Sequence, residues 1–279
     1  MKKIILNADD FGRHIKINEA VKKAVETGAL RSATLMTTGA AFDDAVNVAK
    51  SAPTLGVGLH LTLVDDTPLS PKENIPTLTG KDGKFYPDYM SFLKAYFMGR
   101  ISLDDIKTEL AAQFAKIERS GLKITHIDSH QHLHHAPGVL EIAVELAKKA
   151  NVYKMRISHT PLFSGESTNI KQLIGRFGLF SLSTYAKFTA KKHNFKSPDN
   201  FAGIVAGEAV SEDFLINEIQ NLKEGATEVM MHPATDNAAI TAIAGWKHDF
   251  ITEYKAASSE KVLNLLREKN VEVINYNNI

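Results

Sequence analysis

Residues 3–38, KIILNADDFGRHIKINEAVKKAVETGALRSATLMTT, contain the alternation that decides the fold. The apolar run 3–8 is typical of a buried strand, and 18–27 has the spacing of an amphipathic helix. Residues 32–38 then read as a second strand. A strand, a helix and a strand in this order predict a unit whose two strands lie parallel in one sheet.

The same alternation continues along the chain. Further strands are expected at 55–63, 123–129, 153–158, 228–231 and 271–276, and further helices at 41–50, 102–120, 138–150, 211–222 and 259–269. Two long stretches, 65–89 and 160–201, interrupt the rhythm and are expected to be irregular insertions that act as substrate loops or lids. We therefore predict an α/β protein, a single domain over residues 1–279 that forms an irregular TIM-like (β/α) barrel. An open doubly wound sheet is the alternative architecture.

The composition restricts the classes of function. The chain has no cysteine, which excludes disulfides and thiolate chemistry and leaves His, Asp and Glu as metal ligands. The 33 basic and 32 acidic residues form no basic stripe, so no nucleic-acid partner is expected. The first apolar run is too short for a secretory signal, and no run is long enough for a membrane span. These features predict a soluble, cytoplasmic protein.

Side chains that carry chemistry recur at the C-terminal ends of predicted strands, where parallel α/β folds place their active sites. Asp9 and Asp10 follow the first strand, and one could bind a metal while the other accepts a proton. Either aspartate could instead be a turn or capping residue. His60 alternates with two leucines, so its ring is expected on the inward face of a barrel. A lone histidine of this kind is more often a core residue.

Histidines mark two later strand ends. Residues 126–135 hold five of the 11 histidines, and His130 and His132 would point the same way if the strand continued through them. His232 ends a late strand at Pro233, so it is expected at the rim as a general acid. Asp10, His60 and His130 could together bind one divalent ion and leave positions open for water and substrate. Zn²⁺ or another transition metal ion suits this set, and Mg²⁺ is less natural beside two imidazoles.

With these residues the chain resembles the YdjC family of carbohydrate deacetylases, which includes chitooligosaccharide deacetylases. Four segments carry the resemblance in the family's order: NADDFG (7–12), GLHLTL (58–63), THIDSHQHLH (125–134) and EVMMHPA (228–234). It implies an irregular TIM-like barrel, a divalent metal and the removal of acetyl groups from N-acetylated sugars. Segments 63–68, 75–85 and 200–207 are similar to the HpnK branch, which is associated with hopanoid biosynthesis, whereas DSHQH (128–132) follows the general family.

The resemblance also implies a role for each matching residue. Carried over position by position, it makes Asp10, His60 and His130 the metal ligands. It makes Asp9 the general base and His232 the general acid. It further implies a homodimer.

Two residues are weaker candidates for substrate binding. Arg156, in the predicted strand 153–158, is expected to orient a carboxylate or to contact the sugar, with a structural ion pair as the alternative, and His132 is the other candidate. The expected function is metal-dependent removal of the N-acetyl group from an amino sugar, either an oligosaccharide or a lipid-linked glucosamine. Two alternatives stay open: a metal-dependent phosphoesterase or amidohydrolase on a similar barrel, and a barrel that binds sugar without catalysis.

Overall fold

The computed structural model describes residues 1–27, 30–159, 170–204 and 209–279. The strands are β1 (Lys2–Phe11), β2 (Ser32–Leu35), β3 (Gly56–Leu61), β4 (Ile127–Ser129), β5 (Asn200–Ala202), β6 (Gly225–Met231) and β7 (Glu272–Val273). The α-helices are α1 (Ile15–Thr27), α2 (Phe42–Ser51), α3 (Tyr89–Phe97), α4 (Leu103–Arg119), α5 (Val139–Lys149), α6 (Ile170–Lys192), α7 (Glu212–Gln220), α8 (Asn237–Ala244), α9 (Phe250–Ala257) and α10 (Glu260–Glu268). Short 3₁₀ helices are η1 (Lys72–Asn74), η2 (His130–His135) and η3 (Tyr276–Asn278).

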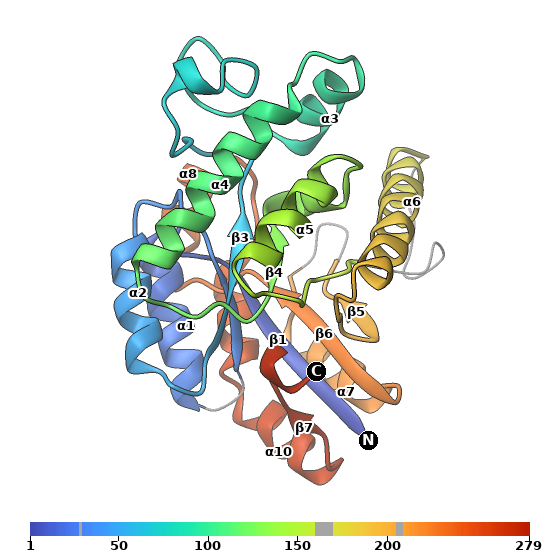
Figure 1. The fold of residues 1–279 in the computed structure, drawn as a ribbon. Coiled ribbons are helices and arrows are strands. Elements are labelled where there is room, and N and C mark those ends of the chain that lie inside the picture. Colours follow the sequence, from blue (N-terminus) through green and yellow to red (C-terminus); the bar gives the residue numbers. More distant parts are fainter. Residues whose placement is uncertain (28–29, 160–169, 205–208) are drawn as a thin grey trace.

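The strands form one curled parallel sheet in the order β4-β3-β2-β1-β6-β5, and β7 pairs with the start of β1. β1 occupies the centre, and its residues from Ile4 to Phe11 are all buried. A strand covered on both faces is an apolar run rather than an alternating one, which is the pattern that the sequence shows here. Helices surround the sheet, and the N-terminus lies at the end of β1 that is remote from α3 (Figure 1).

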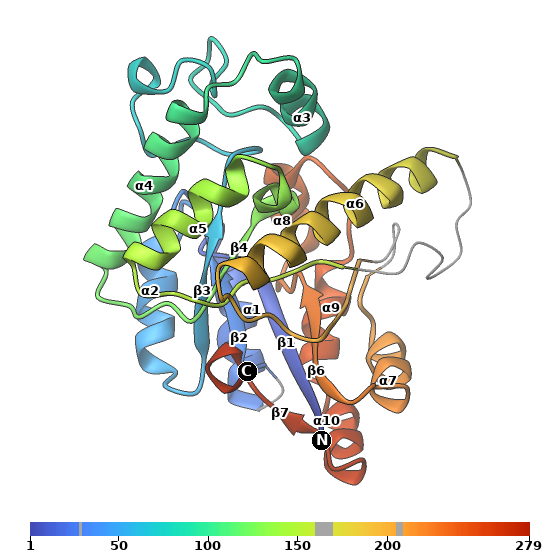
Figure 2. The same cartoon turned by 45° about the vertical axis from the view of Figure 1, so that its right-hand side comes forward.

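The sheet is a distorted half-barrel rather than a flat doubly wound sheet. Beyond β4, Ile127 bridges Met155, and Lys154 bridges Lys196 in the stretch that leads into β5. These single bridges join β4 to the segment around residue 155, and that segment to the stretch that precedes β5. Figure 2 shows β1 between β2 and β6 in the same sheet. The expected strand 153–158 is therefore wrong as a continuous strand, because its pairing is limited to these bridges. The expected TIM-like curvature is confirmed.

The predicted helices begin and end close to the expected residues. Ser102 caps α4, because its Oγ accepts a hydrogen bond from the Asp104 amide at 3.1 Å. The apolar stripe expected on this helix is buried against the core and consists of Ile106, Leu110, Phe114 and Ile117. Among the described helices, none is long and apolar enough to cross a bilayer.

The two expected insertions differ in structure. Within 65–89 only η1 is a regular helix, and together with α3 this part of the chain lies beyond the carboxyl ends of the strands (Figure 1). The irregular stretch expected over 160–201 is wrong from Ile170 onward, because α6 runs to Lys192. Glycines at 175 and 178 and the lack of a single apolar stripe conceal this helix in the sequence. Residues 160–169 and 205–208, where other parts of the expected segments fall, lie outside the described residues.

Candidate active site

A β-bulge at the end of β1 brings two neighbouring aspartates into one site. In a regular strand, Asp9 and Asp10 would point to opposite faces of the sheet. The register between β1 and β2 shifts between Ala8 and Phe11, and Asp10 has a φ of 58°. A bulge of this kind redirects side chains. Both carboxylates consequently lie within reach of the His60 ring.

The turn after the bulge depends on Gly12. Its φ of 88° lies in the left-handed region, and a Cβ atom there would stand 2.7 Å from Cδ1 of Leu35. The Gly12 amide donates a 2.8 Å hydrogen bond to Oδ1 of Asn18, which ties the turn to α1. The turn therefore requires the glycine of the NADDFG segment for a structural reason, which is separate from the chemistry of the aspartates.

Asp10, His60 and His130 form the candidate metal centre. Oδ1 of Asp10 lies 3.3 Å from Nε2 of His60 and 2.9 Å from Nδ1 of His130, and all three side chains are buried. Two ligands of one Zn²⁺ ion, each about 2.1 Å from it, are separated by about 2.9–3.4 Å. The same Oδ1 atom has no hydrogen-bond donor in suitable geometry among the described residues. The three residues therefore fit a divalent ion, as the sequence predicted.

Asp128 orients His60. The Nδ1 atom of His60 lies 2.7 Å from Oδ1 of Asp128, so that Nε2 faces Asp10. Carboxylates commonly fix the rings of metal-binding histidines in this way. Burial alone would lower the pKa of His60, but the Asp128 and Asp10 carboxylates outweigh it and raise that pKa to about 10. No role was predicted for Asp128, although its period-two spacing from His126 and His130 was a usable signal.

Arg13 and Asp65 support the other side of the centre. Nη1 of Arg13 lies 3.3 Å from Oδ2 of Asp10, and Nη2 donates a 2.8 Å bond to Oδ2 of Asp65. The same Asp65 oxygen stands 3.4 Å from Nε2 of His130. Burial opposes ionisation of Asp10, but the charges of His130 and Arg13 keep its pKa well below the usual range. Neither residue was predicted from the sequence, because Asp65 reaches the site only through the path of the chain after β3.

Arg156 holds Asp9 in the barrel interior. Its Nη1 and Nη2 atoms each donate a 2.6 Å bond to one oxygen of Asp9, and they also contact Asp128 at 2.7 Å and Glu228 at 2.8 Å. Although burial raises the pKa of Asp9, the Arg156 charge lowers it below the usual range. Asn7 donates a further 2.8 Å bond to Asp9. Arg156 is 0% exposed, so the side chain orients carboxylates and offers no surface for the expected contact with sugar.

The strand does not continue through His130 and His132, so the condition under which they would point the same way is not met. β4 ends at Ser129, and η2 begins at His130 with positive φ values at Gln131 and His132. The turn leaves His130 on Asp10 and takes His132 to Ser158, whose Oγ lies 3.1 Å from Nδ1 of the ring. His132 stays half-buried, with its ring edge-on to Phe201, and does not join the metal cluster.

His232 stands at the same sheet edge as Asp9. It follows Met231, the last residue of β6, which pairs with Ala8 of β1. The ring is half-buried and lies near the rings of Trp246 and His248, and the main-chain amide donates to the Glu253 carboxylate. The structure thus brings the expected catalytic pair, Asp9 and His232, to the ends of adjacent strands.

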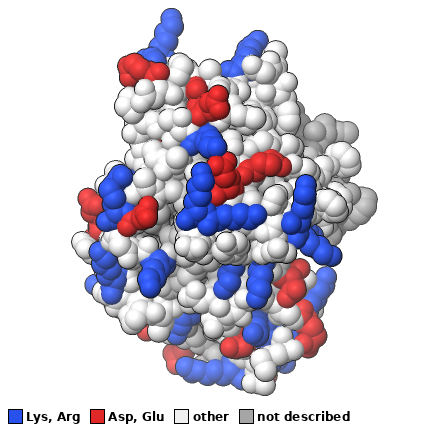
Figure 3. All heavy atoms as spheres, in the orientation of Figure 1, with Lys and Arg blue, Asp and Glu red and all other residues white. Residues whose placement is uncertain are grey.

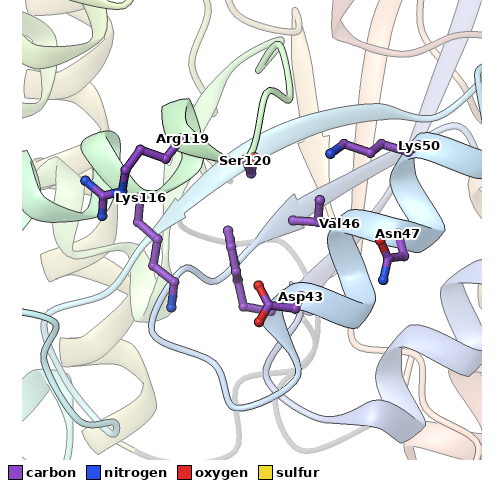
Figure 4. Close-up of a pocket in the computed structure, with 8 residues that line it drawn as sticks. Asp43, Val46, Asn47, Lys50, Lys116, Arg119 and Ser120 are labelled. Carbon is purple, nitrogen blue, oxygen red and sulfur yellow. The ribbon is translucent and has the colours of Figure 1, made fainter.

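A hollow on the outer surface between α2 and α4 contains none of these residues (Figure 4). It is lined by Phe42, Asp43, Val46, Asn47, Lys50, Lys116, Arg119 and Ser120. Basic and acidic side chains are intermingled over the face shown in Figure 3. The candidate site is therefore identified by its cluster of buried Asp, His and Arg side chains, and not by this hollow in the surface.

The YdjC-like protein family matches residues 3–268. The chain belongs to the YdjC-like family. This YdjC-like chain is 30% identical over 276 residues to a carbohydrate deacetylase of Thermoanaerobacter pseudethanolicus, covering 99% of this chain and 98% of that protein. It is 29% identical to a carbohydrate deacetylase of Brevibacillus brevis over 278 residues, or 99% of each chain. A crystal structure of a proposed cellobiose-phosphate cleavage protein from Enterococcus faecalis V583 superposes with a TM-score of 0.76 at 25% identity, covering 99% of this chain and 98% of that one.

Proposed function

We propose that this YdjC-like protein is a metal-dependent hydrolase that removes the N-acetyl group from an acetylated amino sugar. Its family makes it a carbohydrate deacetylase. The observation that carries the proposal is the buried cluster of Asp10, His60 and His130, whose ligand atoms all lie within 4.8 Å of one another. Asp9 lies beside His60, and His232 follows the end of the adjacent strand β6; these two groups can accept and donate protons.

The residues of the centre indicate which ion they would hold. One carboxylate and two imidazoles suit Zn²⁺ or another transition metal ion better than Mg²⁺. A bound ion of this kind polarises an acetyl carbonyl and lowers the pKa of a water molecule. The chain supplies the ligands on three different elements, the β1 bulge, β3 and η2, so the cluster exists only in the folded protein.

Asp9 accepts the proton of the attacking water in this scheme. The Arg156 ion pair keeps Asp9 ionised at neutral pH, which is the state that can take up a proton. The same ion pair fixes both carboxylate oxygens and makes Asp9 a weak base. Arg156 is thus a positioning residue that acts through Asp9.

His232 donates a proton to the departing nitrogen. An amine leaves poorly as an anion, so amide hydrolysis needs a general acid at this atom. Ala8 of β1 pairs with Met231 of β6, so Asp9 and His232 each follow a residue of this last pair. Substrate between them would meet a proton acceptor and a proton donor. Each group would then perform a different half of the reaction.

The sugar beyond the acetyl group distinguishes two substrate classes, acetylated oligosaccharides and lipid-linked N-acetylglucosamine. The segments 63–68 and 75–85 lie beyond the carboxyl ends of the strands (Figure 1), where they would meet this part of the substrate. Their resemblance to the HpnK branch favours a lipid-linked sugar, whereas residues 128–132 favour the oligosaccharide substrates of the wider family. We therefore expect these segments to determine the choice.

Acetate release tests the proposal. Purified protein would be assayed with chitobiose, an N-acetylglucosaminyl lipid and a phosphate ester, before and after treatment with a chelator. We expect acetate from at least one sugar, its loss with chelator, and its return on adding Zn²⁺ or another divalent ion. Phosphate release without acetate release would favour the phosphoesterase alternative. Sugar binding without turnover by metal-loaded protein would favour a non-catalytic barrel.

A further inference from the structure

Trp246 exposes a large aromatic surface beside the proposed general acid. It is the one tryptophan of the chain, and it is 40% exposed. Its ring centroid lies 5.8 Å from that of His232, with the two planes at 86°. Gly245, in the left-handed conformation, ends α8 and turns the chain toward this position. A flat apolar surface therefore borders the place where the leaving nitrogen would be protonated.

Two rings behind Trp246 hold it in place. His248 lies 4.5 Å from the Trp246 ring at 38°, and Phe250 lies 5.5 Å away at 71°. His248 is itself fixed, because its Nε2 is 2.7 Å from Oε1 of Glu253. A supported ring loses little freedom when a ligand covers its open surface, which favours binding.

The buried Glu253 carboxylate ties this aromatic group to the catalytic strand end. Besides His248, it accepts hydrogen bonds from the main-chain amides of His232 and Val210, the latter at 2.9 Å. One carboxylate therefore joins the loop that carries Trp246 to the residue that follows β6. The positions of Trp246 and His232 are coupled through Glu253.

Arg13 ties the same loop to the metal centre from the other side. Its Nη2 atom donates a 3.3 Å bond to the carbonyl of Ile243 in the last turn of α8. Nη1 of the same guanidinium faces Oδ2 of Asp10 at 3.3 Å. Trp246 follows Ile243 by three residues, so its position is set relative to both Asp10 and His232.

We propose that Trp246 is the platform on which the sugar ring that carries the acetamido group stacks, and that it determines specificity for pyranose substrates. This inference rests on the proposed function. A pyranose presents one face of C–H groups, and aromatic side chains contribute large contact areas at ligand sites. Because Trp246 stands beside His232, a sugar ring stacked on its exposed surface would hold its acetamido nitrogen near the proton donor.

Tryptophan fluorescence tests the platform directly, because the emission comes from Trp246 alone. The variant Asp9→Asn, loaded with Zn²⁺ and expected to bind without turnover, would be titrated with chitobiose while calorimetry records binding independently. We expect a blue shift and protection from acrylamide quenching that follow the calorimetric isotherm. Calorimetric saturation with unchanged emission and quenching would overturn the platform alone. If neither chitobiose nor an N-acetylglucosaminyl lipid binds, the proposed function fails and the platform fails with it.

Variants of Trp246 separate sugar stacking from an effect on catalysis. We expect Trp246→Leu to raise KM for chitobiose by roughly tenfold with little change in kcat, and Trp246→Phe to show a smaller rise. The matched control is Tyr153→Leu, which removes an aromatic ring of similar exposure (46%) and should leave KM unchanged. Tyr153 precedes Lys154, which binds the carbonyls of Tyr276 and Asn277 near the C-terminus. An unchanged KM in Trp246→Leu, or a loss confined to kcat, would overturn the proposal.

Discussion

Nδ1 of His60 lies 2.7 Å from Oδ1 of Asp128, and this contact turns Nε2 of the same ring toward Asp10. Asp128 is fully buried and also contacts Arg156 at 2.7 Å. One carboxylate thus connects the candidate metal centre to the group that holds Asp9. The site is a continuous network, and its members can be tested separately.

Asp128→Asn should weaken metal binding without removing a ligand. The amide can still accept a bond from His60, but it lacks the charge that makes the ring a good ligand. Loss of such a partner typically costs 10–100-fold in metal affinity. Titration of metal-free protein with Zn²⁺ by calorimetry would measure the change, with Asp43→Asn, at an exposed position on α2, as the control. Equal affinities in Asp128→Asn and the unaltered protein would contradict the role of Asp128.

Metal binding should release protons. The pKa of His60 is raised to about 10, so this ring carries a proton at neutral pH in the metal-free protein, and the pKa of His130 is also raised. A metal ion needs the neutral rings, and its apparent affinity should therefore increase with pH. Calorimetric titrations at neutral pH in buffers of different ionisation enthalpy would detect the released protons. A binding enthalpy that is independent of the buffer would show that the ligands were already neutral.

Arg156→Met should destabilise the fold and reverse its response to pH. The substitution leaves the carboxylates of Asp9, Asp128 and Glu228 buried without their cation, which costs about 3–5 kcal/mol. In the unaltered protein the folded-state pKa of Asp9 is depressed. Ionised Asp9 therefore contributes its full share to the stability of the folded state above the ordinary carboxyl pKa. This stabilisation is lost as pH falls through the depressed pKa.

In Arg156→Met, burial would instead raise the pKa of Asp9, so that the free energy of unfolding should increase as pH falls from neutral toward 5. Urea unfolding at several pH values would measure both effects. A variant as stable as the unaltered protein at neutral pH would show that the carboxylates do not need this cation.

His232→Asn should slow turnover and leave the metal in place. A positioned general acid contributes roughly 10²–10⁴-fold, so kcat should fall within that range. The defect should shrink for an activated acetyl ester, because its leaving group needs no proton. Steady-state rates with both substrates would test the assignment. An equal loss with the amide and the ester would indicate that His232 acts in another way.

The candidate metal cluster was predicted from the rule that active sites lie at the carboxyl ends of parallel strands, because this rule depends only on topology. β1, β3 and β4 are parallel, so Asp10, His60 and the residue after β4 had to meet at one edge. The β1 bulge could not be predicted, since nothing in the local sequence excludes regular pairing after Ala8. β4 ends at residue 129, as the expected range 123–129 has it, but the strand begins only at Ile127.

The sequence could not predict which residues from distant segments would contact one another at the site. Asp65 and Arg13 meet only because the chain after β3 returns over the end of β1. Arg156 was identified as a candidate, but its contacts with Asp9, Asp128 and Glu228 depend on the curl of the sheet. Helix α6 was missed for a different reason, because the pattern of its own sequence is too weak to predict a helix.

We propose above that Asp10, His60 and His130 hold the ion on which acetate release depends. The most direct measurement is the metal content of purified protein by elemental analysis, together with acetate release from the best substrate, for the unaltered chain and for His130→Ala. His134→Ala is the matched control, because His134 lies in the same η2 helix but contacts Ser129 and the carbonyl of Arg156. We expect His130→Ala to lose both the ion and the activity, while His134→Ala retains the ion. Full acetate release by metal-free His130→Ala would contradict it.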